Sequence, residues 1–271
     1  MMLADLYSCS GLGADGYAAI FGSQAIHGFD IEDQPYYPYQ FTQADALDLL
    51  SDPAGPLSEF SARHASPPCQ EFTTAAHLRV AQGGKSRFGD LLTPTIALLR
   101  QNWGHDPWVV ENVDDNQKKV RRIMTPQPGE HRIILCATMF GLPMWRHRIF
   151  LANFHLRQPE PTGPGVYGAL GCRHDLCPPD PITGKPRPWG VAHVPNDQIP
   201  SGGRTALNAE HGRQVMGSHR SLPWDRLKEG FPPAYTSWVG ADLLRAVGYA
   251  NDAATGAAQS KEPDNYADLR T

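Results

Sequence analysis

The residues best suited to chemistry in this chain lie in one short loop, Ala65-Ser66-Pro67-Pro68-Cys69-Gln70. Each proline fixes its own φ and biases the preceding residue toward extended geometry, so Cys69 sits on backbone with little freedom. This setting predicts a nucleophilic thiol on a loop that leaves a strand, where reactive side chains of open α/β sheets collect. A buried structural cysteine is the alternative, and three further segments argue against it.

These three segments follow Cys69 along the chain, and each carries residues that could assist a thiol nucleophile. They are Glu111-Asn112-Val113, Arg146-His147-Arg148 and Phe231-Pro232-Pro233-Ala234-Tyr235-Thr236. Glu111 follows an apolar run, and a carboxyl group held near apolar side chains tends to stay protonated. The two arginines offer a fixed fork of donors. A strand-end salt bridge for Glu111 and a solvated surface pair for the arginines are the alternatives.

The elements that position these residues begin with a strand at Met2–Tyr7, which runs into the turn Ser8–Gly13. A helical segment at Gly16–Phe21 and a second strand at 25–31 follow, and this strand ends in Asp30. The series is typical of the opening of a nucleotide-binding βαβ unit, although such turns are common. Further elements are expected as a βα step at 41–47, a strand before Cys69, a helix at 90–99, strands at 108–110, 132–136 and 148–153, and helices near 223–227 and 241–245.

Composition limits the class of protein. The chain has 271 residues, a formal net charge of −4 and 41% hydrophobic residues, which is enough for a core. Five cysteines without regular spacing argue against a secreted disulfide framework. No basic region precedes an apolar segment at the N-terminus, and no apolar run approaches membrane-spanning length. We therefore expect a cytoplasmic monomer without a membrane partner.

On these segments, taken in their order along the chain, the sequence resembles the DNA cytosine-5 methyltransferases, in particular the compact members of bacteriophages and bacteria. The resemblance runs from Leu6 to about Gly240. It implies an α/β fold, a Rossmann-like class I S-adenosylmethionine-dependent methyltransferase sheet with a small, mostly irregular target-recognition insert. The expected parts are a catalytic, donor-binding domain at 1–155, the insert at 156–219, a return to the catalytic domain at 220–250 and a flexible tail at 251–271.

The resemblance also implies the catalytic roles. Cys69 would attack carbon-6 of cytosine, which makes carbon-5 nucleophilic enough to accept a methyl group. Glu111, if protonated, would donate to ring N3, and Arg148 would donate to O2. Arg146 would orient the pocket or contact a phosphate. Substrate contacts are expected from Ser66, Gln70, Asn112 and Val113.

The implied methyl donor is S-adenosylmethionine. Its methionine half would lie on the loop from Tyr7 to Gly13, with Ser8 and Gly11 among the contacts. Asp30 would bind the ribose hydroxyls and Ile31 would pack on the adenine, whose amino group would donate to Asp45. Pro68 is expected to complete the donor site. The loop departs from the common Gly-Ala-Gly-Gly pattern, because Cys9-Ser10-Gly11-Leu12 stands there.

The expected partner is double-stranded DNA. The insert carries Arg157, Arg173, Lys185, Arg187, Arg204 and Arg213, which suit phosphate and base contacts. Lys118-Lys119-Val120-Arg121-Arg122 could be a phosphate-contacting loop or a solvated turn. Cys172 and Cys177, with His174 between them and His193 or His155 as further candidates, suggest zinc, but free thiols are favoured and no metal is expected.

Three alternatives remain at this point. One branch of the family methylates tRNA, so the substrate could be RNA. The altered glycine loop would also suit a catalytically silent DNA-binding relative. A nicotinamide-dependent oxidoreductase is suggested only by the opening βαβ pattern. The insert between the Arg-x-Arg and Pro-Pro segments favours duplex DNA.

Overall fold

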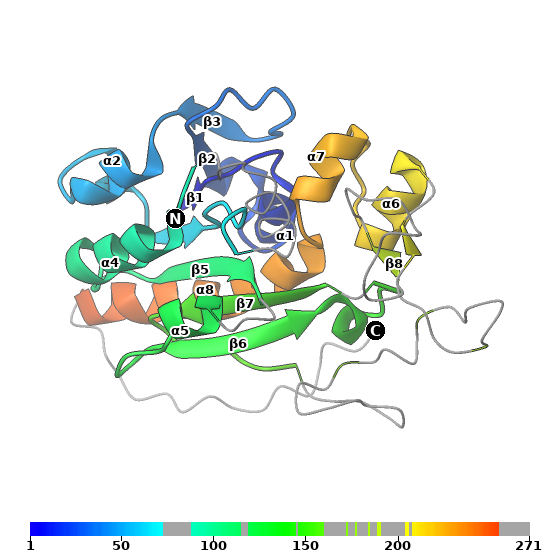
Figure 1. Ribbon diagram of the computed structural model, residues 1–271. Helices are drawn as coiled ribbons and strands as arrows, with labels where there is room; N and C mark the ends of the chain where they lie inside the picture. The colour runs from blue at the N-terminus through cyan, green and yellow to red at the C-terminus, as the bar shows by residue number, and fades with distance from the viewer. Residues whose placement is uncertain are drawn as a thin grey trace.

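The computed structural model describes residues 1–72, 88–114, 119–144, 146–159 and 208–254, together with residues 172, 177, 184, 189–190 and 204–205. Within this part of the chain, seven strands form one sheet in the order β3-β2-β1-β4-β5-β7-β6 (Figure 1). The strands are β1 (Leu3–Leu6), β2 (Ile26–Asp30), β3 (Gln40–Gln43), β4 (Ala62–Ala65), β5 (Trp108–Val113), β6 (His131–Cys136) and β7 (His147–Ala152). Only β7 runs antiparallel to its neighbours, β5 and β6.

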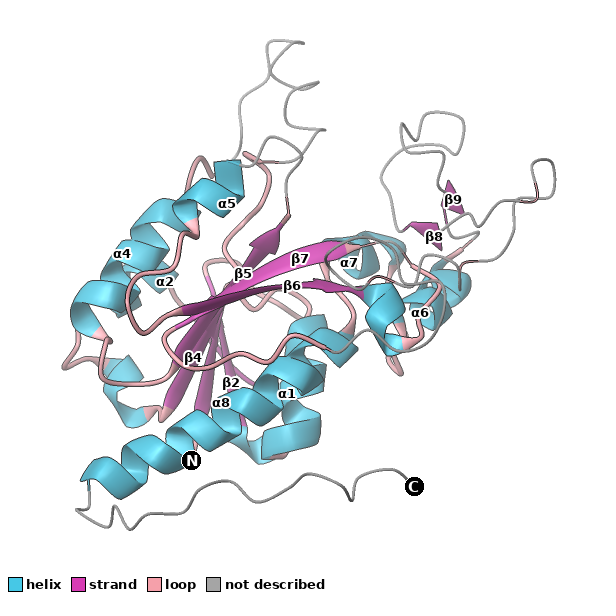
Figure 2. Ribbon diagram, turned by 90° about the horizontal axis from the view of Figure 1, so that it is seen from below, coloured by secondary structure: helices cyan, strands magenta, loops and turns pink. Residues whose placement is uncertain are grey.

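Helices cover both faces of the sheet (Figure 2). One face carries α1 (Leu12–Phe21) and the long α8 (Pro233–Ala254), and the other carries α2 (Ala46–Ser51), α4 (Leu92–Asn102) and α5 (Lys119–Ile123). Two short helices, α6 (Ala209–Met216) and α7 (Trp224–Glu229), lie beyond the end of the sheet where β6 ends and β7 begins (Figure 1). There the two-residue strands β8 (Trp189–Gly190) and β9 (Arg204–Thr205) pair in parallel. The α/β Rossmann-like fold is thus confirmed.

The inner strands are buried because helices cover both sides of the sheet, whereas the edge strand β3 is mostly exposed. In β7, Phe150 and Ala152 pack in the cluster under α1 and α8, while Ile149 and Leu151 pack in the cluster under α4. This alternation follows from the two-residue period of a strand. None of the helices in the described ranges is both long and apolar enough to span a bilayer.

Close backbone contact joins α1 to α8. A Cβ added to Gly16 would lie 2.0 Å from the Pro233 carbonyl oxygen and 2.2 Å from Thr236 Oγ1, so only glycine fits there. Thr236 Oγ1 also donates to the Gly13 carbonyl at 2.6 Å. The segment Pro232–Thr236 at the start of α8 is therefore packed directly against the backbone of α1.

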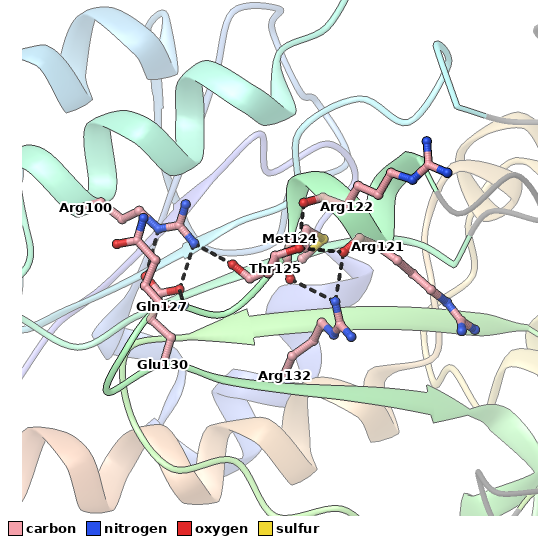
Figure 3. A network of polar contacts seen from close by, with 8 residues as sticks. All are labelled: Arg100, Arg121, Arg122, Met124, Thr125, Gln127, Glu130 and Arg132. Carbon is pink, nitrogen blue, oxygen red and sulfur yellow. Dashed lines mark hydrogen bonds and ion pairs between the residues drawn. The ribbon is translucent and has the colours of Figure 1, made fainter.

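A polar network ties α4 to α5 and β6 (Figure 3). Arg100 donates to both carboxylate oxygens of Glu130 at 2.8 and 2.7 Å and to the Thr125 carbonyl at 3.0 Å. Arg132 caps the end of α5 by donating to the Arg121 carbonyl at 2.8 Å. The basic run 118–122, expected as a loop or turn, is helical from Lys119 onward as part of α5. Lys118 lies outside the described residues.

Three elements differ clearly from those expected. Strand β5 continues through Val113, so the Glu-Asn-Val segment lies inside the sheet because it pairs with β7. Helix α8 begins at Pro233 and ends at Ala254, four residues into the expected tail. Helix α6 forms within the expected irregular insert, since Asn208 caps its start by accepting from the His211 amide at 2.8 Å and Gly217 ends it with φ 63°.

The α1–α8 contact yields a stability prediction. Gly16→Ala forces the helices apart and should lower the free energy of unfolding by about 1–3 kcal/mol or more, as overpacking does. Gly248→Ala in α8 is the control, because an added Cβ meets nothing within 4 Å. It should leave stability unchanged or raise it by up to about 1 kcal/mol. Urea unfolding measures both, and equal effects would contradict the contact.

Candidate active site

The Pro-Cys loop starts directly after β4 and is fastened to two neighbouring strands. The Ser66 amide donates to the Leu6 carbonyl of β1 at 3.2 Å. Asn112 of β5 donates through Nδ2 to the Pro67 carbonyl at 2.9 Å, and this contact is buried. Cys69 is partly exposed, and its carbonyl accepts from the Phe72 amide at 2.9 Å. The thiol therefore stands at the carboxyl edge of the parallel strands, at the end of a braced loop.

Glu111 and Arg148 form an ion pair beside this loop. Arg148 Nε lies 2.8 Å from Glu111 Oε1, and only 12% and 7% of the two side chains are exposed. Val113 lies directly opposite Arg148 in the β5–β7 register. Glu111, two residues before Val113, is therefore the diagonal neighbour of Arg148 on the same face of the sheet. The antiparallel pairing thus brings an arginine from the start of β7 to a carboxyl group near the end of β5.

The protonation of Cys69 and Glu111 depends on burial and on the arginines. Burial raises the pKa of the Glu111 carboxyl, while the charges of Arg148, His64 and Arg146 oppose this rise. Burial also raises the pKa of the Cys69 thiol; Arg148 and Arg146 lower it and Glu111 raises it further. Because the three charged groups all act on this thiol, the four predicted catalytic residues share one site.

Arg146 is partly buried and holds the chain that precedes α8. Its Nη2 donates to the carbonyls of Lys228 at 3.1 Å and Gly230 at 2.5 Å. Tyr235 donates its hydroxyl proton to the Arg146 carbonyl. Burial and then the neighbouring Arg148 charge lower the pKa of Arg146 to about 9. This geometry fits the expectation that Arg146 orients the pocket.

A buried polar group that the sequence analysis missed lies on the same face of the sheet. His64 Nδ1 is 2.8 Å from Asp5 Oδ1, and Tyr37 donates to Asp5 Oδ2 at 3.0 Å. His64 Nε2 is buried and has no hydrogen-bond partner within the described residues. Asp5 and His64 are 59 positions apart and meet only because β1 pairs with β4. The signal in the sequence was a polar residue inside each strand, Asp5 in Leu3–Leu6 and His64 beside Arg63 in Ala62–Ala65.

The loop after β1 has an unusual backbone. Tyr7 and Cys9 have φ of 58° and 46°, in the left-handed region that non-glycine residues rarely adopt, and Gly11 has φ 78°. Such residues cost about 1–3 kcal/mol each and collect at functional sites. The Cys9 thiol donates to Glu229 Oε2 at 3.3 Å, and Ser10 Oγ donates to the Arg226 carbonyl at 3.3 Å. Cys9 and Ser10 of the loop therefore contact α7.

The residues expected to hold a nucleotide gather at the ends of β1, β2 and β3. Asp30 accepts from the amides of Cys9 and Glu32, each at 3.0 Å. The charges of Asp45 and Asp30 add to burial in raising the pKa of Tyr7 to about 12, so both acids lie near this phenol. Ile31 is 52% exposed, which is high for a large apolar side chain.

Ser8 supplies a further polar atom at this place. Its Oγ is buried without a hydrogen-bond partner in the part of the chain that the structure describes. Asp45 also caps α2 by accepting from the Leu47 amide at 2.8 Å, which leaves its second oxygen for another donor. The exposed Ile31 side chain suits an adenine ring, and the nearby carboxylates suit ribose hydroxyls. The unpartnered Ser8 hydroxyl suits an amino acid group.

The remaining expected contacts lie around the loop. Asn112 is turned toward Pro67 and accepts from the Val113 amide at 3.0 Å, so it braces the loop, and its direct contact with a substrate stays a prediction. Ser66 Oγ donates to the Tyr7 carbonyl at 3.3 Å and joins the two halves of the site. Pro68, Gln70 and Val113 are each partly exposed at the same edge.

Comparison with known proteins supports the fold. No protein-family model matches the chain, and no curated protein matches its sequence. A protein described as a DNA modification methyltransferase, encoded within an E. coli prophage, has a similar structure with a TM-score of 0.56 and 12% identity, over 92% of this chain and 99% of that one. A mutant of Spodoptera frugiperda DNMT2 gives a TM-score of 0.54 at 14% identity over 90% and 100%. S. pombe Dnmt2 methyltransferase gives 0.50 at 14% over 90% and 98%. The chain therefore has the fold of these methyltransferases.

The charges around Cys69 predict its pH-dependent reactivity. Alkylation of Cys69 by iodoacetamide, located by mass spectrometry, should rise with pH to a midpoint above the ordinary value of about 8.5. Arg148→Met should move the midpoint up, because it removes a charge that stabilises the thiolate. Glu111→Gln should move it down, because it removes a negative charge. A wild-type midpoint below the ordinary value, or shifts in one direction, would contradict this electrostatic arrangement.

The Asn112 hydrogen bond predicts the rigidity of the loop. Asn112→Ala leaves the Pro67 carbonyl without its buried donor, at a cost of about 1–3 kcal/mol. Hydrogen exchange of the amides at 69–72 should accelerate. Asn102→Ala is the matched control, since Asn102 donates to the Leu50 carbonyl at 2.9 Å away from this loop. Unchanged exchange in Asn112→Ala would show that the loop does not depend on this bond.

Proposed function

We propose that the protein is an S-adenosylmethionine-dependent DNA cytosine-5 methyltransferase. The observation that carries the proposal is the convergence of a thiol, a buried carboxyl group and two arginines. Cys69 on its braced loop, Glu111, and Arg146 with Arg148 occupy one edge of the sheet. These groups supply a nucleophile, a proton donor and positive charge, which are the functions that addition to a pyrimidine ring requires.

The nucleophile acts at the ring atom next to the methyl acceptor. Carbon-5 of cytosine is too weak a nucleophile to take a methyl group directly. The Cys69 thiolate forms a bond to carbon-6, and the electron pair of the 5,6 double bond moves to carbon-5. After methylation a base removes the carbon-5 proton, the double bond re-forms and the carbon–sulfur bond breaks. A thiolate suits both steps, because it adds readily and can leave again.

Glu111 and Arg148 stabilise charge on the ring. Burial favours the protonated form of Glu111, which can donate to N3 and accept from the exocyclic amine. Arg148 can then turn its guanidinium donors from Glu111 to the cytosine O2. Closure of the site over a base would exclude water and raise the pKa of the carboxyl further.

The residues at the ends of β1, β2 and β3 fit S-adenosylmethionine. Asp30 would bind the ribose hydroxyls, Ile31 would lie against the adenine, and Asp45 would accept from its amino group. The strained loop with Ser8 and Gly11 would lie under the methionine half, and Pro68 would close the site. The donor supplies an electrophilic methyl group on a sulfonium.

We propose duplex DNA as the substrate. A base inside a duplex cannot present carbon-6 to a thiolate, so the target cytosine must leave the stack. Residues 156–219 are the proposed recognition region, and Arg173, Lys185 and Arg187 within it lie outside the described residues. The description of the prophage-encoded structural neighbour as a DNA modification methyltransferase agrees with this proposal.

Covalent trapping tests the proposal. With S-adenosylmethionine and duplex DNA containing 5-fluorocytosine, the protein should form an adduct that resists denaturation, because fluorine cannot leave as the carbon-5 proton does. Cys69→Ser should abolish the adduct, whereas the control Cys177→Ser, at a buried cysteine outside the proposed reaction, should retain it. Glu111→Gln should slow its formation by about 100-fold or more, in the range of a lost general acid.

Parallel reactions test the substrate and the donor. Tritiated methyl transfer should appear on duplex DNA and not on tRNA. Transfer to tRNA alone would replace the DNA substrate with RNA. A protein that binds DNA but shows no adduct and no heat of binding with S-adenosylmethionine would be a silent relative, and the proposed reaction would be wrong.

A further inference from the structure

Two cysteines and a histidine meet on the side of β7 that faces away from Glu111. They are Cys136 at the end of β6, His147 at the start of β7, and Cys172 from the segment that follows β7. Their ligand atoms all lie within 4.8 Å of one another, and the Cys172 Sγ to His147 Nε2 distance is 3.3 Å. Cys136 and Cys172 are 0% and 2% exposed. No step proposed for Cys69 uses these groups.

The strand pairing holds two of the three in place. Cys136 and His147 are directly opposite each other in the antiparallel β6–β7 register, so their side chains share a face. Arg146 and Arg148 flank His147, and neighbouring residues of a strand point to opposite faces. The third group, Cys172, comes from 25 positions further along the chain. The cluster therefore connects the hairpin that carries the arginines to the proposed recognition segment.

The donor set and spacing suit a soft divalent ion. Thiolate and imidazole together are typical ligands of zinc, with Zn–S of about 2.3 Å and Zn–N of about 2.0–2.1 Å. In a tetrahedral site these bond lengths separate two sulfurs by about 3.8 Å and a sulfur from a nitrogen by about 3.6 Å. The three ligand atoms lie within 4.8 Å of one another, at most about 1 Å more than these separations, so small side-chain shifts would complete the geometry.

We propose that Cys136, His147 and Cys172 bind one zinc ion, which fastens the segment after β7 to the β6–β7 hairpin. Binding releases the two thiol protons to solvent, and the fourth position is held by water or by a nitrogen or oxygen ligand. The ion acts as a structural cross-link and takes no part in the methyl transfer. His147 stands between Arg146 and Arg148, and Cys172 lies in the segment proposed to contact DNA. The ion therefore couples the positions of the two arginines to the position of that segment.

The proposal differs from the zinc set that the sequence alone suggests. Cys172 and Cys177 are five positions apart, yet the cluster within the described residues contains only Cys172 of the two. His155 stands edge-on to the His131 ring at 4.7 Å and is not among the three ligands. His174 and His193 lie outside the described residues.

Metal analysis of the full chain tests the site. Protein purified without chelator and under reducing conditions should contain about one zinc per chain, the stoichiometry of a single site. Cys136→Ser, Cys172→Ser and His147→Gln should each lose most of it. Cys177→Ser is the matched control, because it removes another buried cysteine of the same segment, and it should keep the zinc. Circular dichroism would verify that each variant is folded.

A measurement on the unaltered chain avoids any doubt about folding. X-ray absorption at the zinc edge should show two sulfur ligands, with nitrogen or oxygen completing the shell. Cobalt substitution should give the thiolate charge-transfer and ligand-field bands of a tetrahedral site. The proposal would be overturned if the reduced protein held no zinc after reconstitution, or if a Cys136–Cys172 disulfide formed in place of the site. A shell of three or four sulfurs would also overturn it, as would zinc that Cys136→Ser retains and Cys177→Ser loses.

Discussion

The site depends on one buried ion pair, that of Glu111 and Arg148. A carboxyl group taken out of water tends to hold its proton, and a guanidinium at 2.8 Å opposes this tendency. The balance between burial and the arginine decides whether the carboxyl can donate a proton. Burial dominates, because the net direction of the Glu111 pKa is upward. Neither partner can be removed without leaving the other buried and unpaired, which is costly.

The reversed direction of β7 makes this pair possible. In an all-parallel sheet the carboxyl edge receives only residues from strand ends and the loops that follow. Because β7 is antiparallel, its first residues lie at the same edge, and Arg148 arrives opposite Val113. The same hairpin sets His147 opposite Cys136 on the other face. One topological feature therefore builds the arginine side of the proposed active site and two thirds of the proposed metal site.

Packing elsewhere supports the strained and polar parts. The left-handed residues Tyr7 and Cys9 cost free energy, and their loop is held by the Asp30 carboxylate and by contacts to α7. Arg146 fixes the chain between α7 and α8 through two carbonyls. The close approach of Gly16 to Pro233 then locks α8 over the sheet. The loop after β1, expected to hold the methyl donor, and Arg146 beside the Cys69 thiol are thus both held by α7, α8 and the chain between them.

Local patterns predicted much of the fold, and short segments supplied the candidate site residues. Apolar runs located most of the strands, and the loop at Cys69 indicated the strand before it. The order of the Pro-Cys, Glu-Asn-Val and Arg-x-Arg segments predicted that Cys69, Glu111 and Arg148 belong to one site. Contacts that cross the sheet left no local signal. The Asp5–His64 pair and the Cys136–His147 pair exist only through strand register. Helix α6 was missed because its eight residues include Gly212, and its cap at Asn208 is a weak signal alone.

The protonation of Glu111 is the most direct test of this account. Infrared difference spectroscopy of the protein, with Glu111→Gln used to assign the carboxylic-acid band, gives its titration curve. The account predicts a midpoint above the ordinary glutamate value of about 4.3, with a further rise in Arg148→Met. A midpoint at or below that value in the wild-type protein would mean that Arg148 outweighs burial, and Glu111 could not then serve as the proton donor.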